Sequence, residues 1–370
     1  NCTKKDDEYA GFVNFPLVSN IKGMDPVNSS DLYSGWVMGE IYDQLLQYSY
    51  LERPTKVEPM LADGMPEVSK DGLTYTFKIK KGVLFHDDPS FKATGGKGRE
   101  IMAEDFIYSW KRVADPVNKS DGFWIFEGKI KGMAEWRDEM SKAGKTDYTK
   151  PISGVTAVDD HTLRIQLVKA YPQLLYVLTM IPASVVPHEA VEFYGPEFQN
   201  HPVGSGPYKF KSWVRNSKVI LVKNPTYRVE TYPTKGEAGD QEKGFLADAG
   251  KQLPLNDGVT FTEIIEDQPR WLNFRKGELD LSEIPKDNFD SAVKNDALIP
   301  EMSAQGVILT KWIDPDTTFN AINMEDPVLG GVKGKLIRQA MALAVDTPEL
   351  IKKFYNNRAI PAEGPVPPTL

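Results

Sequence analysis

Apolar and polar residues alternate in several short segments of the first 225 residues, and this period of two is typical of half-buried strands. The sequence DGLTYTFKIKKG opens with an Asp-Gly turn, and the alternation after it predicts a strand over 74–79. Segments 159–167 and 217–225 repeat the pattern, the first after Asp-Asp and the second before Asn-Pro. In the first strand we expect the inward-facing side chains to be Tyr75, Phe77 and Ile79.

Other segments have the three-to-four-residue apolar spacing of amphipathic helices. MAEDFIYSWKRVADP, residues 102–116, places its apolar side chains on one face and ends at an Asp-Pro pair. KGKLIRQAMALAV, residues 333–345, carries a second apolar stripe, and a new helix follows with Thr347 as the expected N-cap and Pro348 in its first turn. Because strands and helices are mixed without strict β-α-β alternation, we expect a mixed α/β (α+β) fold.

Two polar, glycine-containing segments interrupt this pattern. They cover residues 86–100 and 232–258, and we interpret both as inserted loops. The closing stretch EGPVPPTL is rich in proline, which marks a loop, and no strand follows it. We therefore expect the last domain to be incomplete in this chain.

Composition narrows the class of protein. The 370 residues are 41% hydrophobic and 26% charged, with a net charge of −8, which is typical of a globular protein and disfavours nucleic acid as a partner. The most apolar run, LLYVLTMI, ends at Pro182 and is far shorter than the roughly 20 residues of a membrane span.

The sequence has one cysteine, Cys2, so no disulfide within the chain and no thiolate metal cluster can form. Two interpretations of Cys2 stay open: a free exposed thiol, or the lipid-attachment residue of a bacterial lipoprotein followed by a polar tether.

The search for catalytic chemistry centres on HPVGSGPYKFKSW, residues 201–213. A nucleophile elbow needs G-x-S-x-G between a strand and a helix, whereas Ser205 has a glycine on each side and precedes a strand-like alternation. We interpret Ser205 as part of a turn. The four histidines have no metal-ligand spacing, and no phosphate-binding loop is present. We expect no catalytic residue, no metal and no cofactor; a hydrolase with a dispersed site is the enzyme alternative.

Several segments, in order, resemble the family 5 extracellular solute-binding proteins of bacteria, which include the oligopeptide- and dipeptide-binding proteins of ABC importers. MDPVNSSDLYSGWVMGEIYDQLLQY is similar to the family's L-D-P loop and the helix after it. VSKDGLTYTFKIKKGVLFHDD and HPVGSGPYKF resemble its D-G-x-T-Y-T-F block and its G-T-G-P-Y turn. RWLNFRKGELDL, TFNAIN and IRQAMALAVDTPELI extend the resemblance through nearly the whole chain.

The resemblance implies a periplasmic binding protein type II-like fold with two hinged lobes. Lobe I is expected to combine residues 1–47 and 172–262, with an inserted subdomain over 48–171. Residues 263–370 are expected to form part of lobe II. The family's chains extend further, so the acidic residue that binds a peptide's amino group is expected beyond residue 370.

The resemblance also implies a function: the substrate-binding component of an ABC importer, which encloses a peptide between its lobes and is not an enzyme. The expected partners are the peptide and the membrane permease, and we expect a monomer in the periplasm or on the cell surface, anchored through Cys2. A non-peptide solute such as a nickel chelate or an oligosaccharide, or a sensor without a transport role, is the alternative. The ligand-binding residues that this resemblance implies are Ser30, Asp31, Leu32, Tyr33, Phe123, Trp124 and, as a strand of lobe II, Thr317, Thr318, Phe319 and Asn320.

Overall fold

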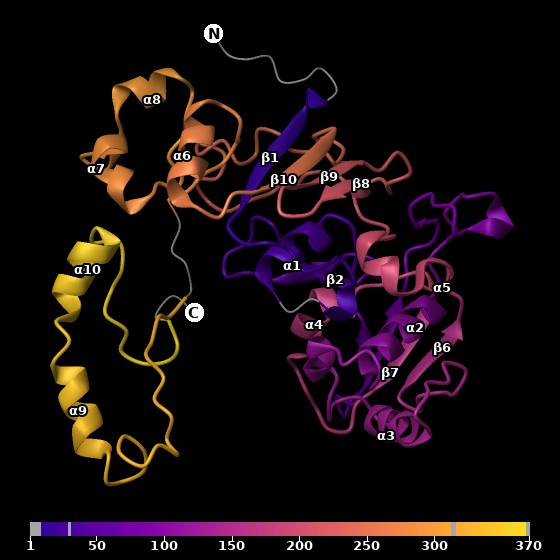
Figure 1. The fold of residues 1–370 in the computed structure, drawn as a ribbon. Helices are drawn as coiled ribbons and strands as arrows, with labels where there is room; N and C mark the ends of the chain where they lie inside the picture. The colour runs from indigo at the N-terminus through magenta and orange to yellow at the C-terminus, as the bar shows by residue number, and fades with distance from the viewer. Residues whose placement is uncertain (1–8, 29–30, 312–315, 368–370) are drawn as a thin grey trace. The chain divides into compact units, whose positions relative to one another are not determined.

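The structure is a computed structural model that describes residues 9–28, 31–311 and 316–367 (Figure 1). The chain divides into two compact units, residues 1–282 and 283–370. Cys2 and Ser30 lie outside the described residues. The mixed α/β fold expected from the sequence is confirmed, because each unit contains both strands and helices.

The first unit contains a four-stranded sheet whose strands come from distant parts of the sequence. Its order is β1-β10-β9-β8, with β1 parallel to β10 and the other neighbours antiparallel. The strand predicted over 217–225 is β9 of this sheet. The strands are β1 (Phe12–Leu17), β8 (Tyr208–Val214), β9 (Lys218–Lys223) and β10 (Gly258–Glu263).

A second four-stranded sheet in the same unit is antiparallel throughout, in the order β4-β5-β7-β6. The strands predicted over 74–79 and 159–167 are β5 and β7, and all three side chains expected to point inward are buried. Its strands are β4 (Glu67–Val68), β5 (Thr74–Lys78), β6 (Val155–Asp159) and β7 (Thr162–Gln166); β2 (Leu46–Tyr48) and β3 (Val57–Pro59) form a separate pair.

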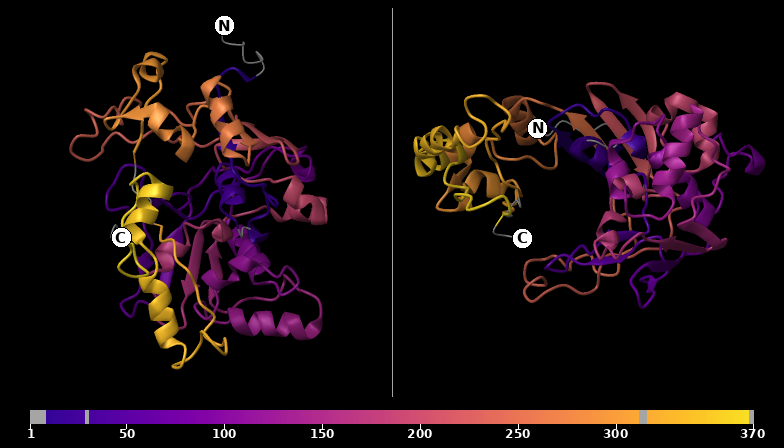
Figure 2. Two further views of the ribbon diagram at one scale, coloured as in Figure 1. Left: turned by 60° about the vertical axis from the view of Figure 1, so that its left-hand side comes forward. Right: turned by 90° about the horizontal axis from the view of Figure 1, so that it is seen from below.

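Within the first unit the two sheets lie at opposite ends, with α1 and β2 between them (Figures 1 and 2). Helix α2 (Ala103–Ala114), predicted from the sequence, packs against β6 and β7 and buries Phe106 and Trp110 completely. One apolar core continues from the second sheet to the first. The other helices of this unit are α1 (Leu32–Gly39), α3 (Met133–Ala143), α4 (Leu174–Val177), α5 (His188–Tyr194) and α6 (Asp267–Arg275), with 3-10 turns η2 (Pro26–Asn28), η3 (Lys92–Thr94), η4 (Asp121–Ile125), η5 (Ile181–Ala183) and η6 (Gly195–Asn200).

The segment 232–258 is a succession of turns up to the start of β10, as the sequence predicts for a loop. The Tyr232 hydroxyl donates to the backbone oxygen of Phe245 at 2.8 Å, which closes the loop on itself. The Glu237 carboxylate accepts a bond from the backbone N–H of Arg53 at 2.6 Å. The loop is therefore attached to the residues that follow β2.

The regular elements of the second unit are mainly helices, and most of its other described residues are irregular. The helices predicted over 333–345 and from 346 onward are confirmed, although Asp346, not Thr347, is the N-cap: its carboxylate accepts from the Glu349 N–H at 3.0 Å. Thr347 is instead the first residue inside the helix. The elements are η7 (Lys286–Asn288), α7 (Phe289–Ala292), β11 (Val293–Lys294), β12 (Ala297–Leu298), α8 (Pro300–Ala304), α9 (Lys335–Leu343) and α10 (Thr347–Tyr355).

The strand expected over residues 317–320 is wrong. This stretch is irregular, and no backbone ladder joins it to another segment of the described chain. Three of its four side chains are exposed, including Phe319 at 76%. A strand requires a neighbouring strand to pair with its backbone N–H and C=O groups. Among the described segments, none pairs with the backbone of residues 317–320 in this way.

Candidate ligand-binding surface

Helix α1 begins at the loop that the family resemblance assigns to the ligand. Asp31 is the N-cap of this helix, and its carboxylate accepts from the backbone N–H of Ser34 at 2.8 Å and from the Ser34 hydroxyl at 2.7 Å. Such a cap stabilises a helix start by about 1 kcal/mol. Both oxygens of Asp31 are thus engaged in holding the helix, while the next side chain, Leu32, is 62% exposed.

The exposed side of α1 is apolar and aromatic. Tyr33 and Trp36 meet edge to face with ring centroids 5.2 Å apart, and Trp36 is 44% exposed. Leu32 and Trp36 are four residues apart and therefore lie on the same face of the helix. We call Leu32, Tyr33 and Trp36 the α1 surface. Trp36 was not among the predicted ligand residues, although its spacing from Leu32 was a signal for including it.

The loop before α1 is held by a buried ion pair. Both oxygens of the Asp25 carboxylate accept from the Arg112 guanidinium, at 3.0 and 2.7 Å, and both side chains are buried. Burial lowers the pKa of Arg112, but the paired carboxylate raises it more, so its pKa lies above the ordinary value. Arg112 belongs to α2, which packs against β6 and β7 of the second sheet. The ion pair therefore joins the loop before α1 to α2.

Segment η4 lies beside this loop, because the Ser120 hydroxyl donates to the backbone oxygen of Val27 at 2.6 Å and η2 packs against η4. The structure thus places the loop that precedes the first predicted stretch beside the 3-10 turn that carries the second. The two aromatic residues of η4 differ in exposure. Phe123 is buried, and the Arg137 guanidinium lies 4.4 Å from the centroid of its ring. Trp124 is 49% exposed, and the Lys129 ammonium lies 5.9 Å from its ring centroid.

The turn around Ser205 is structural. Ser205 is 1% exposed, and its hydroxyl donates to the buried Asp43 carboxylate at 2.7 Å. The same carboxylate oxygen accepts from Arg228 at 2.7 Å. A Cβ added at Gly204 would lie 2.1 Å from the Ile41 carbonyl oxygen, so only glycine permits this close approach. Strand β8 follows at Tyr208, which confirms that this motif is a bend before a strand.

His86 holds the same turn from the other side. Its backbone N–H donates to the Gly204 oxygen at 2.7 Å, and its Nε2 lies 3.0 Å from the Gly206 carbonyl oxygen, where it must be the donor. Burial of the ring lowers the pKa of His86 to about 4. Because His86 is neutral and hydrogen-bonds the backbone oxygens of Gly204 and Gly206, its role is structural. Among the described residues no group of three histidine, cysteine or acidic side chains is placed to hold a metal ion.

The fold is that of periplasmic binding proteins. The chain superimposes on the periplasmic binding protein DppA from Helicobacter pylori in complex with the peptide STSA with a TM-score of 0.68 and 25% identity, covering 97% of this chain and 61% of that one. An oligopeptide-binding protein, OppAIV from Borrelia burgdorferi, gives a TM-score of 0.69 at 23% identity, covering 96% and 61%. In the described chain no helix has the length and apolar character of a membrane span.

The chain belongs to the bacterial extracellular solute-binding proteins, family 5, whose model matches residues 56–370. It is 27% identical over 350 residues to the glutathione-binding protein GsiB of Pectobacterium atrosepticum, covering 94% of this chain and 54% of that protein. For GsiB of Escherichia coli O1:K1 the identity is 25% over 353 residues. The chain thus spans about half the length of these relatives, since it covers 54% and 55% of them. The family consists of solute-binding proteins rather than enzymes.

Replacement of Asp25 by alanine will leave the Arg112 charge buried without its carboxylate. We expect the free energy of unfolding, measured by urea denaturation, to fall by about 3–5 kcal/mol. The double variant Asp25→Leu/Arg112→Met removes both charges and should lose less than the single variant. As a control, Lys56→Gln breaks an exposed ion pair with Glu52 and should change stability by at most about 1 kcal/mol. Equal losses in Asp25→Ala and Lys56→Gln would contradict the assignment.

The buried neutral His86 predicts a pH dependence of stability. Above its unfolded-state pKa of 6.5 the residue is neutral in both states; as the pH falls toward its folded pKa of about 4, only the unfolded chain binds the proton. The free energy of unfolding should therefore fall by up to about 1.4 kcal/mol per pH unit in this window. The difference between wild type and His86→Gln isolates this contribution. His188→Gln, which keeps His86, should retain the full decline, and its loss there would refute the prediction.

Proposed function

We propose that this chain is the ligand-binding part of an ABC importer's substrate-binding protein and that it binds oligopeptides or dipeptides. The observation that carries the proposal is the similarity over 97% of the chain to a solved protein with a peptide bound, DppA from Helicobacter pylori. The relatives from Pectobacterium atrosepticum and Escherichia coli are named for glutathione, which is itself a tripeptide. Both comparisons favour short peptides over other solutes.

The α1 surface and Trp124 suit this ligand chemistry. An extended peptide pairs with protein backbone as an added strand would, and apolar or aromatic side chains beside it contribute contact area without selecting one sequence. Leu32, Trp36 and Trp124 are exposed, while the loop before α1 is held to α2 by the Asp25–Arg112 pair and to η4 by the Ser120–Val27 bond. A surface that is already ordered loses little entropy when the ligand binds.

The proposed domain arrangement follows the family resemblance. Lobe I comprises residues 1–47 and 172–262, the inserted subdomain comprises 48–171, and 263–370 belong to lobe II. The distant pairing of β1 with β10 supports a discontinuous first lobe. Ser30 and Asp31 contact the ligand from lobe I in this proposal, and residues 317–320 contact it from lobe II as irregular chain.

The remaining features of the proposal concern the cell. The protein works as a monomer outside the cytoplasmic membrane, is anchored by a lipid on Cys2, delivers its ligand to the permease and catalyses no reaction. Membership of an extracellular solute-binding family supports the location. Mass spectrometry of the native protein tests the anchor by the added acyl mass on its first tryptic peptide.

Peptide binding is tested by calorimetric titration of the protein with a pool of short peptides and with glutathione. If an exposed ring contacts the ligand, Trp124→Ala should weaken binding about tenfold or more, which corresponds to about 1.4 kcal/mol. Leu32→Ala should weaken it by a smaller factor, because a smaller apolar area is removed.

Phe193→Ala is the matched control, since Phe193 is 47% exposed on α5, outside the proposed site. It should leave the affinity unchanged. The absence of binding heat with every peptide would reject the proposed ligand class. Equal weakening in Trp124→Ala and Phe193→Ala would reject the proposed surface while leaving the ligand class intact.

A further inference from the structure

Lys129 places an ammonium group beside the exposed aromatic ring of η4. Its Nζ lies 5.9 Å from the ring centroid of Trp124 and 5.3 Å from that of Tyr171. Aromatic rings within about 6 Å of a cation stabilise it, because the face of each ring carries partial negative charge. Lys129 is half-buried, whereas Trp124 is 49% exposed. The cation is therefore held next to a ring that a ligand can reach.

The hydrogen bonds of Lys129 leave its charge without a counter-ion. Its Nζ donates to the backbone oxygen of Trp124 at 2.6 Å and, more weakly, to that of Glu127 at 3.4 Å. Both acceptors are neutral, and no carboxylate among the described residues forms an ion pair with Lys129. An ammonium group has three N–H donors. One of the three therefore has no acceptor within the described part of the chain.

The backbone fixes the position from which this side chain extends. The Lys129 N–H donates to the Phe126 oxygen at 3.0 Å, and the Lys129 oxygen accepts from the Val168 N–H at 2.8 Å. The next residue, Ile130, forms an antiparallel bridge with Leu167, directly after β7. Lys129 thus joins the end of η4 to the second sheet, and its ammonium group is held at both its backbone and its tip.

Two other cations near η4 already have other roles. Arg112 is paired with the Asp25 carboxylate, and Arg137 lies over the buried ring of Phe123. The net charge of −8 disfavours the approach of an anionic ligand, so a local cation is needed to bind one. Of these three cations, Lys129 is the one that has no carboxylate partner and lies beside an exposed ring.

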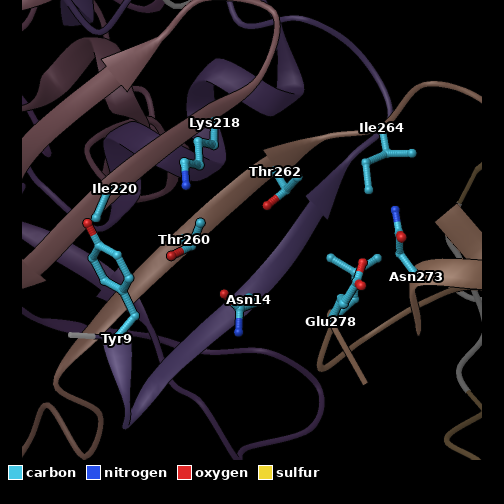
Figure 3. Close-up of a pocket in the computed structure, with 10 residues that line it drawn as sticks. Tyr9, Asn14, Lys218, Ile220, Thr260, Thr262, Ile264, Asn273 and Glu278 are labelled. Atoms are coloured by element: carbon cyan, nitrogen blue, oxygen red, sulfur yellow. The ribbon is translucent and has the colours of Figure 1, made fainter. Parts of the chain in front are cut away.

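Another lysine, Lys218, lines a polar cavity of about 260 Å³ beside the first sheet (Figure 3). Glu278 lines the same cavity, so an anionic group that entered it would meet a like charge as well as the lysine. The Lys218 ammonium has no hydrogen bond to the described residues, whereas that of Lys129 is fixed by a bond of 2.6 Å. Lys129 is therefore the better-positioned cation for binding an anion.

We propose that Lys129 binds a carboxylate of the peptide ligand and makes the site selective for peptides that carry one. This inference rests on the proposed function, because it requires that the peptide packs against Trp124. The carboxylate accepts from the remaining N–H of the ammonium group and neutralises its charge. A hydrogen bond between two charged groups is stronger than one between neutral groups, so a peptide without the carboxylate binds more weakly.

The test is calorimetric titration of the intact protein with two pairs of tripeptides. The first pair is trialanine with a free C-terminal carboxylate and trialanine with a C-terminal amide. The second pair is the amides of Ala-Glu-Ala and Ala-Gln-Ala. We expect the protein to bind the charged member of one pair about tenfold or more tightly than the neutral member. The first pair identifies a C-terminal carboxylate as the bound group, and the second identifies an acidic side chain.

Variants separate recognition from a structural role. Lys129→Gln should bring this affinity ratio close to one, and Lys129→Arg, which keeps a cation, should retain most of it. Lys142→Gln removes an exposed lysine of α3 and should leave the ratio unchanged. If Lys129 only stabilised η4 through its bond to the Trp124 backbone, Lys129→Gln would weaken binding of the charged and neutral peptides by the same factor and leave the ratio as it was.

Equal affinities within both pairs would overturn the proposal, and so would a ratio that persists unchanged in Lys129→Gln. Either result leaves the proposed peptide function intact, since the peptides still bind. The absence of binding heat with all four tripeptides and with the peptide pool would instead reject the peptide function and this inference together.

Discussion

The buried pair of Asp25 and Arg112 is the constraint on which the candidate ligand surface depends. A charge this deeply buried must stay paired, because an uncompensated charge in the interior costs several kcal/mol. The loop before α1 therefore keeps its position relative to α2, and the bond from Ser120 to Val27 adds η4 to the same assembly. The loop before α1 and the segment η4, about ninety positions apart in the sequence, are therefore held together in the fold.

A second buried polar cluster holds together the segments that precede β2 and β8. Asp43 accepts from Ser205 and Arg228, while His86 binds the backbone on either side of Ser205. Four segments that are far apart in the sequence meet at this turn, and glycine is required because the Ile41 backbone approaches it so closely. Ser205 and His86, which look most like catalytic residues in the sequence, thus have structural roles. A serine between two glycines is therefore weak evidence for a catalytic site on its own.

The strands and helices that the sequence predicted well are those whose periodicity is decided locally. Tyr75 and Phe77 alternate with polar neighbours, and α2 has a continuous apolar face, so burial selects one conformation. The strand predicted over residues 317–320 was wrong because a strand forms only beside a partner strand, and the local sequence pattern does not specify that partner. The Asp25–Arg112 pair joins positions 87 residues apart, and the local sequence around either residue does not predict its partner. Trp36, by contrast, was within reach of the sequence through its spacing from Leu32.

Strand β10 shows how one local rule produces both a core and a cavity. Val259 and Phe261 enter the apolar core, so the period of two forces Thr260 and Thr262 onto the opposite face. Parallel pairing with β1 and antiparallel pairing with β9 then set Asn14 and Ile220 directly beside Thr260. The register that places Val259 and Phe261 in the core therefore also fixes which polar side chains share the opposite face, and a one-residue slip of β10 would exchange the two sets.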